Sequence, residues 1–163
     1  MTEANAYQRL ITLLDEGGAR YRAIDHPEEG RTELVSAMRG HAPAEAAKCI
    51  ILMVKIGRKE TRFVLAVVPG DARVDLEAVK RLKRGTFIRF AEQSVAEALG
   101  GSVAGTILPF PLDPRLELIV DEAVARSSII YFNAGRLDRS LALDTEDYLR
   151  IAKPRIEPIA LRT

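Results

Sequence analysis

The sequence is poor in the residues that many enzymes use for metal or nucleophilic chemistry. Its 163 residues include one cysteine, Cys49, two histidines, His26 and His41, and no tryptophan. A single cysteine excludes an intramolecular disulfide framework and is typical of a reducing compartment. Because the histidines lack the spacing of a paired metal site, we predict no bound metal and no other cofactor.

Long apolar runs and an excess of one charge are also lacking. No apolar run approaches the ~20 residues of a membrane span, and acidic residues interrupt the first 18 residues, unlike a signal peptide. The 24 basic and 23 acidic side chains leave a net charge of +1, which indicates no global attraction to nucleic acid. We predict a cytoplasmic protein with no membrane or DNA partner, although a local patch could still contact RNA.

The remaining composition is that of a globular protein, with 47% hydrophobic and 29% charged residues. Residues 1–163 suit one domain, and periodicity and turn residues divide them into alternating helices and strands. We predict a mixed α/β (α+β) fold, in which helices surround a central mixed sheet. The expected helices are 4–16, 32–39, 76–84, 92–99 and 145–151, and the expected strands are 19–25, 48–56, 62–68, 86–91, 116–120, 128–132 and 140–143.

Several boundaries carry specific signals. The nearly continuous apolar run 48–56 predicts a strand buried on both faces, paired with 62–68 in a hairpin. Asp75 is expected to cap the helix that Gly85 ends, and Asp144 with Asp147 resembles a capping box. The Gly- and Pro-rich stretch 101–114 has no periodicity and is expected to be a loop.

Three features could carry chemistry. Lys48 opens the buried strand, either as a snorkelling strand-end residue or as a cation that holds a phosphate. The segment 100–110 is either a surface turn or a loop whose glycines let backbone N–H groups face an anion. Asn133 and Gly135 follow a strand, where their residue types alone favour a tight turn over a functional role.

The order of these pieces resembles a known family. It comprises AAKCIIL, VLAVVPGDARVDL, the loop Gly-x-Val-x-Gly-x-x-x-Pro at 101–109, and a strand leading into Asn-Ala-Gly at 133–135. This pattern is similar to the YbaK family and to the editing insertion domain of bacterial prolyl-tRNA synthetases, over roughly residues 20–152. The resemblance implies a compact domain with a partly barrel-like sheet that removes wrong amino acids from tRNA without a metal or a protein nucleophile.

The resemblance also implies roles for individual residues. Lys48 would hold the phosphate or ribose of the terminal adenosine, and Gly105, with Thr106, would place backbone amides against the ester carbonyl and the attacking water. Asn133 would touch the substrate. The expected partners are the aminoacylated end of tRNA and an aminoacyl-tRNA synthetase.

The sequence departs from the family pattern in the loop. Thr106, Leu108 and Pro111 stand where relatives have a glycine, a serine or threonine, and a glycine. These positions, with Pro109, are expected at the mouth of the pocket, and they bear on amino-acid specificity.

Other residues allow both a functional and a structural interpretation. Met38 is either a pocket wall or core, and His26 is either a substrate contact or a structural residue before Pro27. Cys49, inside an apolar strand, is expected to be inert packing. The basic run Lys80, Arg81, Lys83 and Arg84 suits a solvated helix face or a contact with the tRNA backbone.

The residues leave three functions open. One is a deacylase that stabilises an oxyanion and uses the neighbouring ribose hydroxyl for proton transfer, since no side chain is an obvious general base. Alanine, cysteine, serine and threonine are the amino acids expected for its pocket. The alternative is a module of the same fold that binds a nucleotide, a small molecule, tRNA or a synthetase without turnover. A hydrolase of another activated ester or amide is a further possibility.

Overall fold

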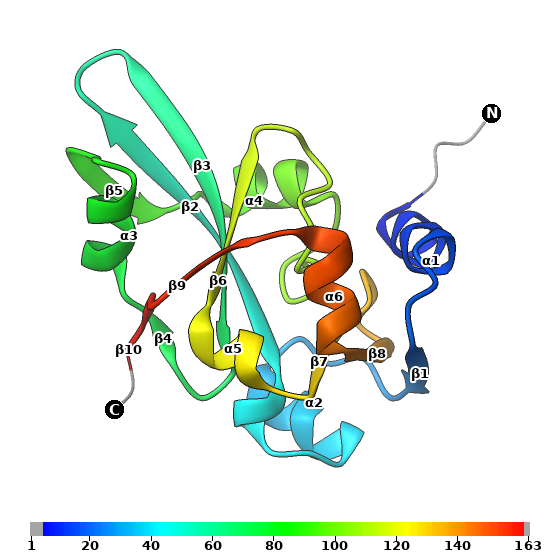
Figure 1. Cartoon of the computed structure of the whole chain (residues 1–163). Coiled ribbons are helices and arrows are strands. Elements are labelled where there is room, and N and C mark those ends of the chain that lie inside the picture. The colour runs from blue at the N-terminus through cyan, green and yellow to red at the C-terminus, as the bar shows by residue number, and fades with distance from the viewer. Residues whose placement is uncertain (1–4, 162–163) are drawn as a thin grey trace.

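The computed structural model describes residues 5–161, which form a five-stranded sheet with a three-stranded sheet beside it (Figure 1). The strands of the large sheet are β2 (Ala47–Ile56), β3 (Glu60–Pro69), β5 (Phe87–Phe90), β6 (Leu116–Asp121) and β9 (Arg155–Glu157). Their order is β5-β2-β3-β6-β9, with β2 antiparallel to β3 and β5, and with β6 parallel to β3 and β9. The predicted mixed sheet is confirmed, but the barrel-like closure was wrong, because this sheet does not close into a barrel.

The hairpin of β2 and β3 forms the centre of the large sheet. Lys48 pairs with Val68 and Ile56 with Glu60, and Gly57 in the turn has the positive φ of +65° that glycine adopts readily. Side chains alternate across a strand, so Ile51 packs in one core cluster and Leu52 in another. This confirms the prediction of a strand buried on both faces.

The small sheet brings distant segments of the chain next to the start of β2. It consists of β1 (Tyr21–Asp25), β8 (Arg139–Asp144) and β7 (Ile129–Asn133), in that order and all antiparallel. A parallel bridge between Ala46 and Tyr131 joins its outer strand to the large sheet. The end of β7 therefore lies close to the beginning of β2.

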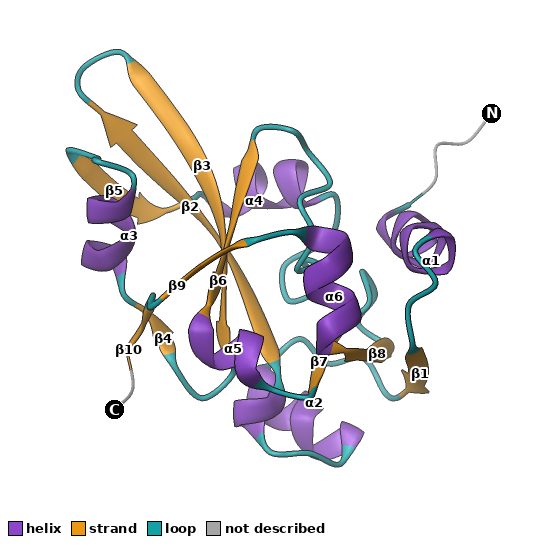
Figure 2. Ribbon diagram, viewed as in Figure 1, coloured by secondary structure: helices purple, strands orange, loops and turns teal. Residues whose placement is uncertain are grey.

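Helices lie around the large sheet on several sides (Figure 2). They are α1 (Ala6–Glu16), α2 (Thr32–Arg39), the 3-10 helix η1 (Pro43–Glu45), α3 (Leu76–Leu82), α4 (Gln93–Gly100), α5 (Glu122–Arg126) and α6 (Thr145–Ala152). Asn5 and Gln8 form a capping box at α1, and the Asp75 side chain accepts from the Ala78 amide at α3, as predicted for that cap.

Two predicted boundaries were wrong in detail. Helix α3 ends at Leu82, and the residue with positive φ after it is Arg84, at 54°, rather than Gly85. At α6 the Asp144 carboxylate accepts from the Asp147 amide, but the Asp147 carboxylate accepts from the amide and side chain of Arg20 instead of closing a capping box.

The C-terminal segment adds elements that the sequence did not predict. Strand β9 extends the large sheet, and β10 (Ala160–Leu161) pairs with β4 (Arg73–Val74). Asp121 holds this segment, because its Oδ1 accepts from the amides of Ile159 and Ala160, at 2.9 and 3.0 Å. None of the helices in residues 5–161 combines the length and apolarity that a membrane crossing requires.

Candidate functional site

A cavity of about 190 Å³ lies where the start of β2 meets α2, the loop 101–115 and the end of β7. We call it the first cavity. It brings together Lys48, Gly105 and Asn133, which the sequence placed in one site. Its lining is otherwise built from small and apolar side chains and one arginine: Gly30, Thr32, Val35, Arg39, Ala46, Ala47, Cys49, Ile107 and Phe132.

Gly105 occupies a position that only glycine fits. Its φ is +87°, and a Cβ there would lie 2.9 Å from the Cα of Gly30. The amides on either side are occupied, because Ala104 N–H donates to Glu97 Oε2 and Thr106 N–H donates to Val103 O. The Gly105 amide makes no hydrogen bond within residues 5–161, and Gly105 lines the cavity, so this amide is a candidate donor to a ligand there.

Asn133 holds the glycine loop in place. Its Nδ2 donates to the carbonyls of Glu29 and Gly105, at 2.8 and 3.0 Å, and its Oδ1 accepts from Ser140 Oγ at 2.8 Å. The side chain is buried and its amide group is fully engaged. Its contacts give Asn133 a positioning role for Gly105, and its substrate contact stays a prediction.

Lys48 lies at the edge of the first cavity. Alternation along β2 places it on the face of Ile50, opposite Ala47 and Cys49, and its Nζ donates to the carbonyl of Ala72. Burial lowers the pKa of the Lys48 ammonium, and the charge of Asp71 opposes that shift. The ammonium is thus fixed by the backbone after β3, beside the cavity.

Arg39 is a buried cation that sequence reasoning missed. Only 8% of it is exposed, Nη1 donates to Ser140 Oγ at 3.1 Å, and Nε has no hydrogen-bond partner. Burial lowers its pKa to about 10, and no carboxylate among residues 5–161 forms an ion pair with it. An unpaired buried charge is costly, and Arg39 lines the cavity, so it is a candidate to bind an anionic or hydroxyl ligand.

The other predicted loop residues, Thr106, Leu108, Pro109 and Pro111, do not line the first cavity. Thr106 is fully buried, and its hydroxyl donates to Val103 O at 2.7 Å. Leu108 packs in the core, and the Pro109 carbonyl accepts from the buried Tyr148 hydroxyl at 2.7 Å. These contacts shape the loop, and roles for these residues at the substrate stay predictions.

His26 and Met38 also lie outside the cavity lining. His26 Nε2 is 2.7 Å from Ser140 Oγ, which in turn donates to Asn133 Oδ1, so His26 contacts Asn133 only through Ser140. Met38 is 44% exposed, and the interpretation of it as core was wrong. The α2 residues that line the cavity are Thr32, Val35 and Arg39, and Met38 is not among them.

Cys49 lines the cavity but is not set up as a nucleophile. Burial raises the pKa of its thiol well above the usual range, and Sγ donates to Ala47 O. Within residues 5–161 no group of three or more histidine, cysteine, aspartate or glutamate side chains could hold a metal ion.

The missed residues gave only weak signals in the sequence. Arg39 stands in the last turn of a helix before Gly40, where a solvent-exposed cation is common. Gly30 lies in a polar stretch without periodicity, so its contact with Gly105 could not be foreseen.

Comparison with known proteins agrees with this geometry. The family model of the aminoacyl-tRNA editing domain matches residues 26–151. The chain is 39% identical to the multifunctional Ser/Thr-tRNA deacylase ProXp-y of Escherichia coli strain K12, over 92% of this chain and 90% of that protein. It is 28% identical to the proline--tRNA ligase of Bacillus licheniformis, over 71% of this chain and 19% of the ligase. The crystal structure of the hypothetical protein APE2540 shares the fold, with a TM-score of 0.84 at 19% identity, over 94% of this chain and 99% of that one.

Proposed function

The chain belongs to the aminoacyl-tRNA editing domain family, and on this premise we propose that it hydrolyses the ester of tRNA mischarged with serine or threonine. The observation that carries the proposal is the first cavity, which joins an unoccupied backbone amide at Gly105 to two cations, Lys48 and Arg39. We also propose that residues 1–163 act as one editing domain in the cytoplasm, with a synthetase as the source of mischarged tRNA.

The reaction needs little from side chains, because an aminoacyl ester is already activated. Water adds to the ester carbonyl carbon, and the Gly105 amide donates to the oxygen that becomes negative. The bond to the ribose oxygen then breaks, and the proton of the attacking water passes to that oxygen through the neighbouring ribose hydroxyl. Free amino acid and tRNA with its terminal hydroxyls restored are the products.

The small volume of the first cavity supports a small amino acid. Its 190 Å³ is below the roughly 300–1,000 Å³ of pockets for drug-sized ligands. The polar groups Thr32 and Arg39 line it together with apolar side chains. Arg39 is suited to donate to the hydroxyl of serine or threonine, and a buried donor left unpaired by alanine would disfavour that amino acid. The activity of the relative from Escherichia coli agrees with this choice.

A deacylation panel tests the proposal. The purified protein is incubated with tRNAs charged with serine, threonine, alanine and proline, and release of amino acid is followed. We expect release of serine and threonine, and at least tenfold slower release of alanine and proline.

Two lysine variants control this experiment. Lys48→Ala should lower kcat/KM by about 100-fold, because a charge-assisted contact with phosphate is lost. Lys55→Ala removes an exposed lysine from the other end of the same strand and should leave the rate unchanged. Stable binding of charged tRNA with no release would instead favour a binding module without turnover.

A further inference from the structure

A second cavity, of about 400 Å³, lies on the other side of Lys48. Lys48 lines both cavities, so the two are neighbours across one side chain. The second cavity is bounded by β2, β4, β5, β10 and the first residue of α3, and its lining is Lys48, Ile50, Arg73, Val74, Leu76, Phe90 and Leu161.

The lining combines an apolar surface with positive charge. Among the described residues that form it, Lys48 and Arg73 are the charged ones, and both are cations. Phe90 leaves an aromatic ring 55% exposed, and Leu161 is 45% exposed. An exposed aromatic ring next to cations is the combination that binds single-stranded nucleic acid, where bases stack and phosphates pair.

Phe90 is exposed because it lies on β5, an edge strand of the large sheet. It pairs with Leu52 at the edge strand β5 and shares the face of Ile50 and Leu52. Phe87 belongs to the same strand and is 50% exposed, but three residues away it lies on the opposite face. Only Phe90 of the two lines the second cavity.

Lys48 lines both cavities, so a bound chain can pass from one to the other. We therefore propose that the second cavity binds a base of the single-stranded 3′ end of the tRNA, stacked on Phe90. The inference rests on the proposed function, since the terminal ribose carries the ester into the first cavity. Lys48 then lies where the phosphate of the terminal nucleotide passes, and the chain continues into the second cavity beside Arg73. This site supplies binding without taking part in the bond-breaking step.

Steady-state kinetics with seryl-tRNA test the site. Phe90→Ala should raise KM by about tenfold, which corresponds to about 1.4 kcal/mol of base stacking, and should leave kcat within twofold. Phe90→Tyr should retain the wild-type KM because the aromatic face is kept. The matched control Phe87→Ala should behave as wild type. Equal KM values for Phe90→Ala and Phe87→Ala would overturn the proposal.

A binding measurement separates this inference from the catalytic one. An uncharged CCA trinucleotide is titrated into each protein and followed by NMR, with no reaction involved. We expect the wild type and Phe87→Ala to bind alike, and Phe90→Ala to bind about tenfold more weakly. If no amino acid is released from any tRNA but this binding depends on Phe90, the nucleotide site stands and the deacylase proposal fails. If the trinucleotide does not bind, or binds wild type and Phe90→Ala with the same affinity, the proposed nucleotide site is wrong even if the protein is an active deacylase.

Discussion

The two cavities that meet at Lys48 differ in size and in the chemical character of the groups that line them. The first is small, and its donors are a backbone amide at Gly105 and a buried guanidinium at Arg39. The second is twice as large and is walled by exposed apolar side chains such as Phe90 and Leu161. Rigid donors in a confined space stabilise a transition state, whereas an open apolar surface adds binding energy that is equal in ground and transition states.

The two cavities should therefore affect different kinetic constants. Changes in the first cavity should lower kcat, and changes in the second should raise KM. The following predictions test that division, beginning with the variant of largest expected effect.

Gly105→Ala should cause the largest loss, a fall in kcat of about 10²–10³-fold, the range for loss of an oxyanion donor. The added Cβ would meet the Cα of Gly30 at 2.9 Å, so the loop must move and carry its amide away. Gly101→Ala is the matched control: it also has positive φ, 77°, but a Cβ there meets only a Leu112 side chain at 3.7 Å. Equal kcat values for the two variants would show that backbone strain, and not the position of the amide, controls the rate.

Asn133→Ala should lower kcat by about 10–100-fold, because the carbonyls of Glu29 and Gly105 lose their shared donor. Leaving buried groups unpaired should also lower the free energy of unfolding by about 1–3 kcal/mol, as measured by urea denaturation. Asn133→Asp keeps the shape and the acceptor for Ser140 but lacks the donor, so it should fail similarly. An active Asn133→Asp enzyme would contradict the positioning role.

Arg39→Met should lower kcat/KM for seryl-tRNA by about tenfold and change the rate for alanyl-tRNA much less. The same variant should raise the free energy of unfolding by about 1 kcal/mol, or Tm by about 2–4 °C, because a buried unpaired charge is removed. Thermal unfolding and the ratio of the two rates measure both effects. A stable variant with an unchanged serine-to-alanine ratio would remove Arg39 from specificity.

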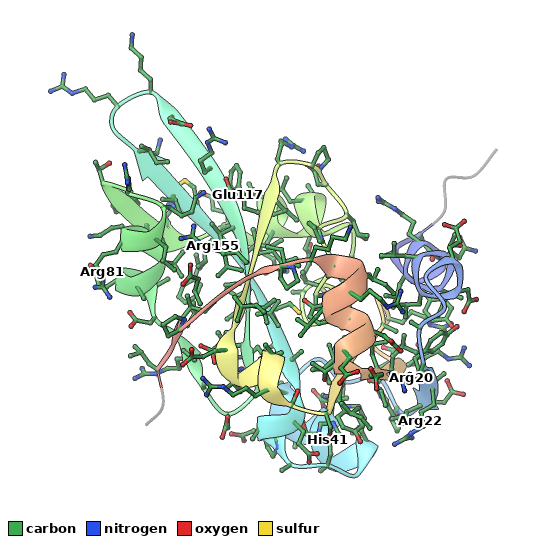
Figure 3. The ribbon with its side chains drawn as sticks, viewed as in Figure 1. Arg20, Arg22, His41, Arg81, Glu117 and Arg155 are labelled. Carbon is green, nitrogen blue, oxygen red and sulfur yellow. The ribbon has the colours of Figure 1, made fainter. Side chains whose placement is uncertain are left out.

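Arg81→Ala should have the smallest effect, less than a twofold change in KM. Arg81 lies on the outer side of α3, exposed to solvent (Figure 3), and in the same basic run Lys80 and Lys83 already pair with Glu77 and Glu117. KM measured at two salt concentrations checks this expectation. If KM instead rises, and its dependence on salt concentration weakens by the equivalent of about one phosphate contact, the RNA-binding surface extends from the second cavity along α3 to Arg81.

The parts of the fold that the sequence predicted are those with local signals. Helix α2 begins at Thr32 and ends at Arg39 as expected, because Gly40 adopts the left-handed conformation that ends it. The β2–β3 hairpin followed from its apolar run and turn. In contrast, β9 and β10 are two or three residues long and exist through pairing with β6 and β4, so no local pattern marks them. Helix α5 has only five residues and was missed for the same reason.

The residues of the candidate site likewise fall into those that the sequence could predict and those that it could not. Lys48, Gly105 and Asn133 could be named from residue types and order, and the structure brings them to one cavity. Arg39 and Gly30 could not, because burial of a helix-terminal arginine and contact between two glycine backbones arise only when distant segments pack. The pairing of Phe90 with Leu52 likewise decides which of two exposed phenylalanines faces the second cavity.

The contact between Gly30 and Gly105 has a consequence for how such a protein can change over time. The backbones of two loops touch without an intervening side chain, and Asn133 ties both through their carbonyls. The direct contacts that hold Gly105 are therefore made by Gly30 and Asn133, and not by the side chains of Thr32, Arg39 and Ile107, which line the same cavity. Under the proposed function, substitutions at Thr32 and Ile107 could change the preferred amino acid during evolution while the loop that holds the Gly105 amide is retained.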